Sequence, residues 1–273
     1  MSFHIVADSC CELTADMKKR GNIEIAPLTL EVGGESILDD ETFDQKYFLK
    51  RVAECPECPK SACPSPDYFR KSFLNGAERC YAVTLSAQLS GSYNSAVLGA
   101  NLAQEENEDL KIHVFNSRSA SIGETLIVKK IVECEEAGMS FERVVETVEL
   151  YISTQNTYFV LENLETLRKN GRLSKAKALV ASALKIKPVM GATPEGDIVQ
   201  LDHFHQCFVD AIVNDAQHVE NKTLAISHCN CPERAEMVKE ALLERLAVQD
   251  VFVLDTQGVS SMYANDGGII IAL

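Results

Sequence analysis

The chain has 273 residues, 46% of them hydrophobic, and it carries 40 acidic against 26 basic side chains, a formal net charge of −14. This length allows one large α/β domain or two smaller ones with a sizeable core, and the acidic charge disfavours nucleic acid and anionic membranes as partners. The chain shows no cationic start before an apolar stretch and no apolar run of roughly 18 residues, so we expect a cytoplasmic protein, not inserted in a membrane, whose ten cysteines are reduced thiols.

Short apolar strands alternate with helix-period segments in the first half of the chain. The expected strands are residues 4–7, 23–30, 80–85 and 112–115. The expected helices are a first one ending near residue 20 and opened by a Ser9/Glu12 capping box, one starting at Ser65-Pro66, and then 91–106, 122–137 and 140–153. This alternation predicts a parallel sheet. No G-x-G-x-x-G loop follows the first strand, which argues against a dinucleotide site there.

The pattern changes near residue 155, where we place a domain boundary. The second half is expected to contain a strand at 157–161, two helical pieces joined at 169–172, a hairpin of 186–190 with 198–201, a helix at 206–219, a strand at 223–227, a helix from Pro232, and strands at 251–254 and 269–273. We therefore predict an α/β fold with an N-terminal parallel-sheet domain, 1–155, and a C-terminal domain with a mixed sheet, 156–273.

Hydroxyl residues gather where three of the predicted strands end. Asp8-Ser9 follows the first strand, Ser86, Ser90 and Ser92 follow the third, and residues 117–121 follow the fourth. A serine at a helix start is also a common cap, which alone would explain any one of them. Ligands of open α/β sheets bind beyond the carboxyl ends of the strands, and a helix start offers N–H groups to an anion. The pattern favours a small-molecule anion site at this edge.

Two other kinds of site remain open from the residues alone. A serine esterase would use Ser90 with His228 and a carboxylate such as Asp8, although residues 89–93 do not match the G-x-S-x-G nucleophile elbow. A zinc-binding scaffold would use Cys55, Cys58 and Cys63, although no second C-x-x-C completes a ligand set.

Six segments together make the chain similar to the DegV family. They are Asp8-Ser9, Ser-Ala-Cys-Pro-Ser-Pro at 61–66, Leu-Ser-Gly-Ser-Tyr-Asn-Ser-Ala at 89–96, Asn-Ser-x-x-x-Ser-x-Gly at 116–123, Leu-Glu-x-Leu-x-x-Leu-Arg-Lys-Asn-Gly-Arg-Leu-Ser at 161–174, and Ile-Lys-Pro-Val at 186–189. Their order and spacing cover nearly the whole chain.

The resemblance implies a cofactor-free binding protein that holds one long-chain fatty acid, such as palmitate, in a tunnel between two α/β domains. Some members carry the acyl chain for a separate ATP-using subunit of fatty acid kinase, so that catalysis resides in the partner. By position, Ser90 and Ser61 match the family residues that bind the carboxylate. The supporting residues that we expect around this site are Asp8, Ser9, Gly91, Ser92, Ser117, Arg172 and His228.

The sequence departs from the family pattern at three places. At 61–65 the family's Thr-Ser-Gln-Pro-Ser has become Ser-Ala-Cys-Pro-Ser, which keeps a hydroxyl at Ser61 but loses polar groups at 62 and 63. The family's Gly-Thr-His-x-Gly-Pro-Gly segment aligns with residues 262–268, so Ala264 stands where a histidine would contact the carboxylate. An arginine of kinase-coupled members is also missing, with His203 or His205 nearest its position. The last two departures affect kinase coupling more than acyl binding, because the buried tail supplies most of the affinity.

Overall fold

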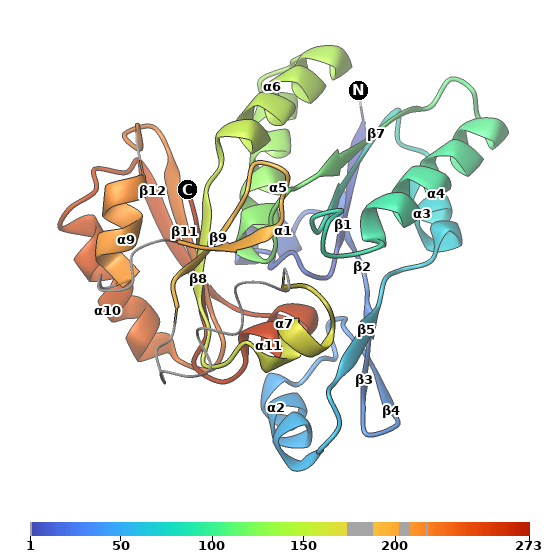
Figure 1. Cartoon of the computed structure of the whole chain (residues 1–273). Coiled ribbons are helices and arrows are strands. Elements are labelled where there is room, and N and C mark those ends of the chain that lie inside the picture. The colour runs from blue at the N-terminus through green and yellow to red at the C-terminus, as the bar shows by residue number, and fades with distance from the viewer. Residues whose placement is uncertain (1, 174–187, 202–207, 217) are drawn as a thin grey trace.

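The computed structural model describes residues 2–173, 188–201, 208–216 and 218–273. Two larger sheets lie on either side of the long helix α5 (Ile122–Glu136), and a small third sheet lies beside them, as Figure 1 shows. The predicted fold class, with one parallel and one mixed sheet, is confirmed. Within the described residues, no helix combines the length and the apolar character that crossing a bilayer requires.

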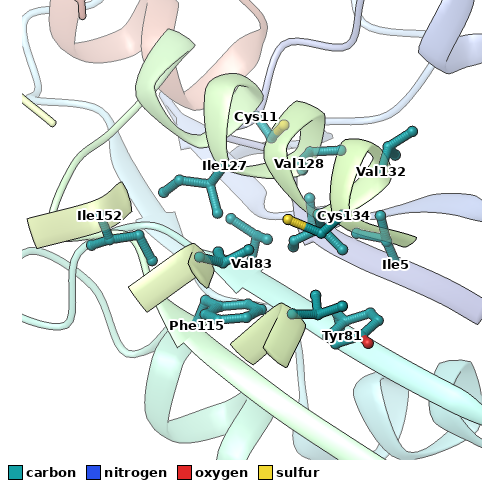
Figure 2. Close-up of a cluster of buried hydrophobic side chains, with 14 of the residues drawn as sticks. Ile5, Cys11, Tyr81, Val83, Phe115, Ile127, Val128, Val132, Cys134 and Ile152 are labelled. Carbon is teal, nitrogen blue, oxygen red and sulfur yellow. The ribbon is translucent and has the colours of Figure 1, made fainter. Parts of the chain in front are cut away.

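The first sheet is entirely parallel and has the order β2-β1-β6-β7. Its strands are β1 (Phe3–Asp8), β2 (Ile23–Ala26), β6 (Arg79–Thr84) and β7 (Lys111–Asn116). Alternate residues of these strands face opposite sides of the sheet, so one face packs against α5 and α6 (Phe141–Thr154) and the other against α3 (Pro66–Phe73) and α4 (Ser92–Glu106). Figure 2 shows the first of these clusters, in which Tyr81, Val83 and Phe115 lie under Ile127 and Val128 of α5.

The second sheet is mixed and has the order β10-β9-β8-β13-β11-β12. Its strands are β8 (Thr157–Val160), β9 (Met190–Ala192), β10 (Ile198–Gln200), β11 (Thr223–His228), β12 (Asp250–Asp255) and β13 (Ile269–Ala272). Helices α9 (Phe208–Asp215) and α10 (Pro232–Leu243) contribute to the core on one face. Ile122 and Leu126 of α5 pack against the other face, so this helix contributes to the cores of both large sheets.

A third sheet corrects the prediction of a single strand at 23–30. The chain leaves the parallel sheet at Ala26, passes Pro27, and enters the antiparallel sheet β4-β3-β5, composed of β3 (Thr29–Val32), β4 (Glu35–Leu38) and β5 (Lys60–Ala62). Proline cannot donate to a sheet ladder, which favours the break there. Helix α2 (Gln45–Glu54), which was not predicted from the sequence, connects β4 to β5.

The predicted Ser9/Glu12 capping box is wrong. The first helix, α1, comprises only Ala15–Lys18, and the Thr14 side chain caps it. The Ser9 hydroxyl instead donates to Asp39 at 2.8 Å, and the Glu12 carboxylate accepts the Ser121 hydroxyl at 2.9 Å. Both side chains form hydrogen bonds with residues from distant parts of the chain, because both are buried in the core.

Most other predicted elements are confirmed. Ser65 and Ser140 cap α3 and α6, and β9 pairs antiparallel with β10 as a hairpin. Its first strand begins at Met190, where the predicted strand 186–190 ends. Two further helices are short: α7 (Glu165–Lys169), the first of the two predicted helical pieces, and α11 (Gly258–Ala264), which was not predicted. The second helical piece, residues 186–187, His203 and His205 lie outside the described residues. The parallel and mixed sheets lie on opposite sides of residue 155 in the sequence, and the exact domain boundary stays a prediction.

Candidate ligand-binding cavity

A cavity of about 370 Å³ lies between the carboxyl edge of the parallel sheet and the mixed sheet. This volume falls within the range of small-molecule sites, roughly 300–1,000 Å³. The first half of the chain lines it with Cys10, Ser61, Ala62, Cys63, Leu85, Leu89, Ser90, Gly91 and residues 118–121. The second half lines it with Thr157, Phe159, Leu161, Leu167, Arg172, Ala192, Gly196, Ile198, Val259, Ser260, Tyr263, Ala264 and Ile270.

The two serines predicted to bind an anion both line this cavity. Ser90 lies in the turn before α4, where its N–H donates to the Ser86 carbonyl at 3.0 Å and its Oγ accepts the N–H of Ser92 at 3.2 Å. Ser61 lies on β5, not in a loop, and β5 pairs with the central strand of the small sheet. Ala62, Cys63 and Gly91 are exposed, so this end of the cavity opens to solvent.

Gly91 and Cys63 lie close together at this opening. A Cβ there would lie 3.2 Å from the Cys63 Sγ, tighter than ordinary van der Waals contact. The supporting role of Gly91 in ligand binding stays a prediction.

Arg172 and Tyr263 place a cation and a phenol at the same end. The Arg172 Nε donates to the carbonyl of Leu89, the neighbour of Ser90, at 3.0 Å. Burial raises the pKa of Tyr263, while the Arg172 charge and the Ser61 hydroxyl oppose that rise. Arg172 is therefore close to both serines, where its charge favours an anion.

Apolar side chains make most of the remaining wall. Phe159 and Leu161 come from β8 and the residue after it, Ile270 from β13, and Ile198 from β10, and all of them belong to one hydrophobic cluster. A ligand that reaches from the open end into this region meets hydroxyls and a cation first and hydrocarbon afterwards. That arrangement fits an amphipathic molecule with an acidic head.

Buried carboxyl groups lie behind the polar part of the wall. Burial raises the pKa of Glu12 to about 8. The hydroxyls of Ser121 and Ser260, two residues that line the cavity, partly offset this rise. Burial also raises the pKa of Asp39 to about 6, although Val259 N–H and the Ser9 hydroxyl bind its charged form. These carboxyl groups leave no signal in the sequence, because they come from separate segments and share no motif.

Four of the supporting residues, Asp8, Ser9, Ser92 and Ser117, are buried and do not line the cavity. Asp8 is fully buried and accepts the N–H groups of Leu85 at 3.0 Å and Cys10 at 3.1 Å. Ser9 and Ser92 are also buried, and the Ser117 hydroxyl donates to the Ser119 carbonyl at 3.0 Å. These contacts hold the strand-end loops that carry the lining residues.

His228 is separate from the cavity. It is buried at the end of β11, its Nδ1 accepts the Cys231 N–H at 3.3 Å and lies 3.2 Å from the Asp255 carboxylate, and it is not a lining residue. Among the described residues, the histidines His4, His113 and His228 form their hydrogen bonds and ion pairs with residues that do not line the cavity. This geometry does not support an esterase that uses Ser90 with His228.

The cysteine alternative is not supported either. Cys58 donates to the Pro59 carbonyl and accepts from Asn170, while Cys63 lies at the opening of the cavity. Among the residues that the structure describes, no three His, Cys, Asp or Glu side chains are arranged to hold a metal ion.

Arg118, Gly196 and Tyr263 line the cavity and were not singled out from the sequence. Tyr263 belongs to the divergent 262–268 segment, as does Ala264, the position at which the resemblance led us to expect a histidine; both line the cavity. Arg118 and Gly196 approach each other where the hairpin of β9 and β10 meets the loop after β7. The positive φ of Arg118, 50°, has no signal in the sequence.

Comparisons with known proteins agree over the whole chain. The sequence model of the DegV family, described as uncharacterised, matches residues 2–273. A DegV domain-containing protein of Streptococcus pneumoniae is 33% identical over 99% of this chain and 98% of its own. Among solved structures, a DegV family protein of Ruminococcus gnavus with vaccenic acid is 51% identical, with a TM-score of 0.95 over 100% of this chain and 99% of the other.

A second similar structure is that of a fatty acid kinase protein. The S. pneumoniae Fatty Acid Kinase (Fak) B3 protein loaded with linoleic acid is 31% identical, with a TM-score of 0.90 over 100% of this chain and 99% of the other. The family match, the relatives and the shared architecture agree with the six segments identified in the sequence. The chain belongs to the DegV family.

Proposed function

We propose that this protein binds one long-chain fatty acid, with the carboxylate at Ser61 and Ser90 and the acyl tail in the apolar part of the cavity. The observation that carries the proposal is a single cavity in which Ser61, Ser90 and Arg172 lie at the open end and Phe159 and Ile270 line the interior. The related proteins solved with vaccenic and linoleic acid support the same ligand class.

The tail supplies most of the binding free energy in this proposal. Burying about 14 methylenes at ~0.8 kcal/mol each gives ~11 kcal/mol before association and ordering costs. A hydrogen bond to a charged group contributes only about 1.5–3 kcal/mol. The methyl group of Ala264 in place of a histidine therefore weakens head-group recognition without abolishing binding.

The proposal includes a kinase partner that acts on the bound acid. It rests on the similarity to the Fak B3 protein and on a carboxylate site that is open to solvent beside Cys63 and Gly91. The protein itself then binds and presents the fatty acid, and the ATP-using partner performs the chemistry. A cytoplasmic location belongs to the same proposal, and the free thiols of the nine described cysteines fit a reducing compartment.

The decisive experiment is solvent extraction of natively purified protein, followed by mass spectrometry. We expect about one fatty acid per chain, and the delipidated protein should bind one equivalent of added fatty acid again. Absence of acid both in the extract and after addition would overturn the proposal. Acyl phosphate, trapped with hydroxylamine after adding a fatty acid kinase catalytic subunit and ATP, tests the partner separately.

A further inference from the structure

Two hydroxyl groups that the proposed carboxylate site does not use lie side by side on the cavity wall. The Oγ of Ser119 and the Oγ1 of Thr157 are 2.6 Å apart, and both residues line the cavity. They are 5% and 7% exposed. Ser119 follows β7 of the parallel sheet and Thr157 begins β8 of the mixed sheet, so the two halves of the chain meet at this pair.

The Thr157 side chain shares its strand face with the apolar wall. Side chains two positions apart point to the same face of a strand, and Thr157, Phe159 and Leu161 all line the cavity. Strand β8 runs from α6 to α7 (Figure 1), and Arg172 follows α7 in the sequence. Thr157 therefore lies at the end of β8 that is opposite to the carboxylate site, where the acyl chain passes.

Gly123 makes room for the other hydroxyl. It lies in the first turn of α5, and a Cβ on Gly123 would overlap the Ser119 hydroxyl and lie 2.9 Å from the Ser119 Cβ. The start of α5 thus packs directly against the Ser119 side chain. This packing holds the Ser119 hydroxyl beside Thr157.

The pair has hydrogen-bonding capacity left over. Each hydroxyl can donate one hydrogen bond and accept two. The Ser119 Oγ also lies 3.4 Å from the Ala120 carbonyl, which is a long contact, and the Thr157 Oγ1 has no second partner among the described residues. If Ser119 donates to Thr157, the Thr157 proton has no acceptor. If Thr157 donates instead, its oxygen keeps two lone pairs, so one more hydroxyl can bind in either case.

A hydrocarbon chain alone makes no use of this capacity. Valine matches threonine in shape and is equally common in strands, so a purely apolar wall has no need of a hydroxyl at position 157. A ligand with a hydroxyl on its chain loses hydrogen bonds to water when it enters an apolar cavity. A pair of hydroxyls on the wall replaces those bonds.

Building on the proposed function, we propose that the ligands of this cavity include long-chain fatty acids with a hydroxyl group on the acyl chain. Ser119 and Thr157 bind that hydroxyl, while the carboxylate stays at Ser61 and Ser90. The binding is non-covalent, and no bond forms or breaks in the ligand. The pair thus determines which fatty acid is preferred.

The test compares hexadecanoate with a series of hydroxyhexadecanoates that carry the hydroxyl at successive carbons. Isothermal titration calorimetry of the delipidated full-length protein gives the ratio of the Kd of each hydroxy acid to that of hexadecanoate. We expect a ratio of about 5 to 150 where the hydroxyl faces hydrocarbon. At the position that reaches the pair, the ratio should be lower by about 2- to 12-fold, because one hydrogen bond is regained.

Thr157→Val removes the hydroxyl and keeps the shape of the side chain. It should raise the ratio by about 2- to 12-fold at the favoured position and leave the ratios at the other positions unchanged. Thr84→Val is the matched control, because Thr84 is a fully buried strand residue on β6 that does not line the cavity. A purely structural role of Thr157 would change the Kd of every acid by the same factor.

The outcomes separate this inference from the proposed function. Binding of hexadecanoate with no favoured hydroxyl position in the wild type overturns the inference and leaves the function intact. A favoured position that persists unchanged in Thr157→Val also overturns it, as does an equal loss in Thr84→Val. If Thr157→Val does not fold, Ser119→Ala together with the wild type decides the question. Failure of hexadecanoate and of every hydroxy acid to bind rejects the proposed function itself.

Discussion

The carboxylate of Asp39 accepts the backbone N–H of Gly258 at 2.7 Å, across 219 positions of the chain. It also accepts the N–H of Val259 at 2.8 Å. Asp39 directly follows β4 of the small antiparallel sheet, whereas these N–H groups begin α11. This helix contributes Val259, Ser260, Tyr263 and Ala264 to the cavity wall. One side chain therefore fixes the position of the helix that closes this side of the site.

Gly258 should tolerate no side chain at this contact. A Cβ there would lie 2.5 Å from the Asp39 Oδ1 and 2.8 Å from the Leu30 Cδ1. We expect Gly258→Ala to lower the free energy of unfolding by about 1–3 kcal/mol, the usual cost of overpacking, measured by urea denaturation. Gly21→Ala is the control, because nothing lies within 4 Å of its Cβ position. Equal stability of the two variants would show that α11 can shift without cost.

Stability should fall as the pH rises from about 5 to 8. Burial raises the pKa of Glu12 from 4.5 to about 8, so the folded protein holds a proton in this range that the unfolded chain has released. Each pKa unit corresponds to about 1.4 kcal/mol, so the loss is on the order of a few kcal/mol. Glu12→Gln should flatten this dependence, measured as urea unfolding at pH 5.5 and 8.5. A variant that loses as much stability as the wild type would assign the effect to Asp8 or Glu124.

Local signals predicted the parallel sheet and its helices well. Ser65-Pro66 and Ser140 each combine a cap with an apolar period, and both begin helices as expected. Ser9 and Glu12 show the same kind of cap signal, yet Asp39 and Ser121 bind their side chains. The difference is burial. A side chain in the core bonds to whichever polar group the fold places beside it, and the local sequence pattern does not identify that partner.

Loss of either cavity serine should weaken fatty-acid binding without unfolding the protein. A hydrogen bond to a charged group contributes about 1.5–3 kcal/mol, so Ser90→Ala and Ser61→Ala should each raise the Kd by about 10- to 150-fold. Displacement of a fluorescent fatty acid measures this change. Ser153→Ala is the control, since its exposed hydroxyl bonds only to Leu150 within α6. Unchanged affinity in both cavity variants would show that the carboxylate head group binds elsewhere.

The candidate site was predictable in part. Ser61 and Ser90 were found because each belongs to a contiguous segment with a recognisable pattern, and both line the cavity. The approach of Arg118 to Gly196 could not be predicted, because it depends on how a hairpin of the mixed sheet packs against a loop of the parallel sheet. Tertiary docking of this kind leaves no periodic signal in either segment.

That docking leads to a prediction about ligand release. The Ser86 hydroxyl donates to the Gly196 carbonyl at 2.8 Å, and the hairpin around Gly196 carries Ala192 and Ile198 of the cavity wall. A Cβ on Gly196 would lie 2.4 Å from the Ser86 Oγ and 2.8 Å from the Arg118 Cα. Gly196→Ala should therefore lift the hairpin tip and speed dissociation of the fatty acid, measured by stopped-flow displacement.

The matched control is Gly76→Ala. Gly76 has a φ of 95°, close to the 90° of Gly196, but nothing lies within 4 Å of its Cβ position. Both substitutions should lower the free energy of unfolding by about 1–2 kcal/mol, because alanine is strained in the left-handed backbone conformation. Only Gly196→Ala also disrupts the contact with Ser86. Ser86→Ala, which loses one hydrogen bond of about 0.5–1.5 kcal/mol, should speed release less than Gly196→Ala. Equal release rates in Gly76→Ala and Gly196→Ala would show that the fatty acid leaves by a route that does not involve this hairpin.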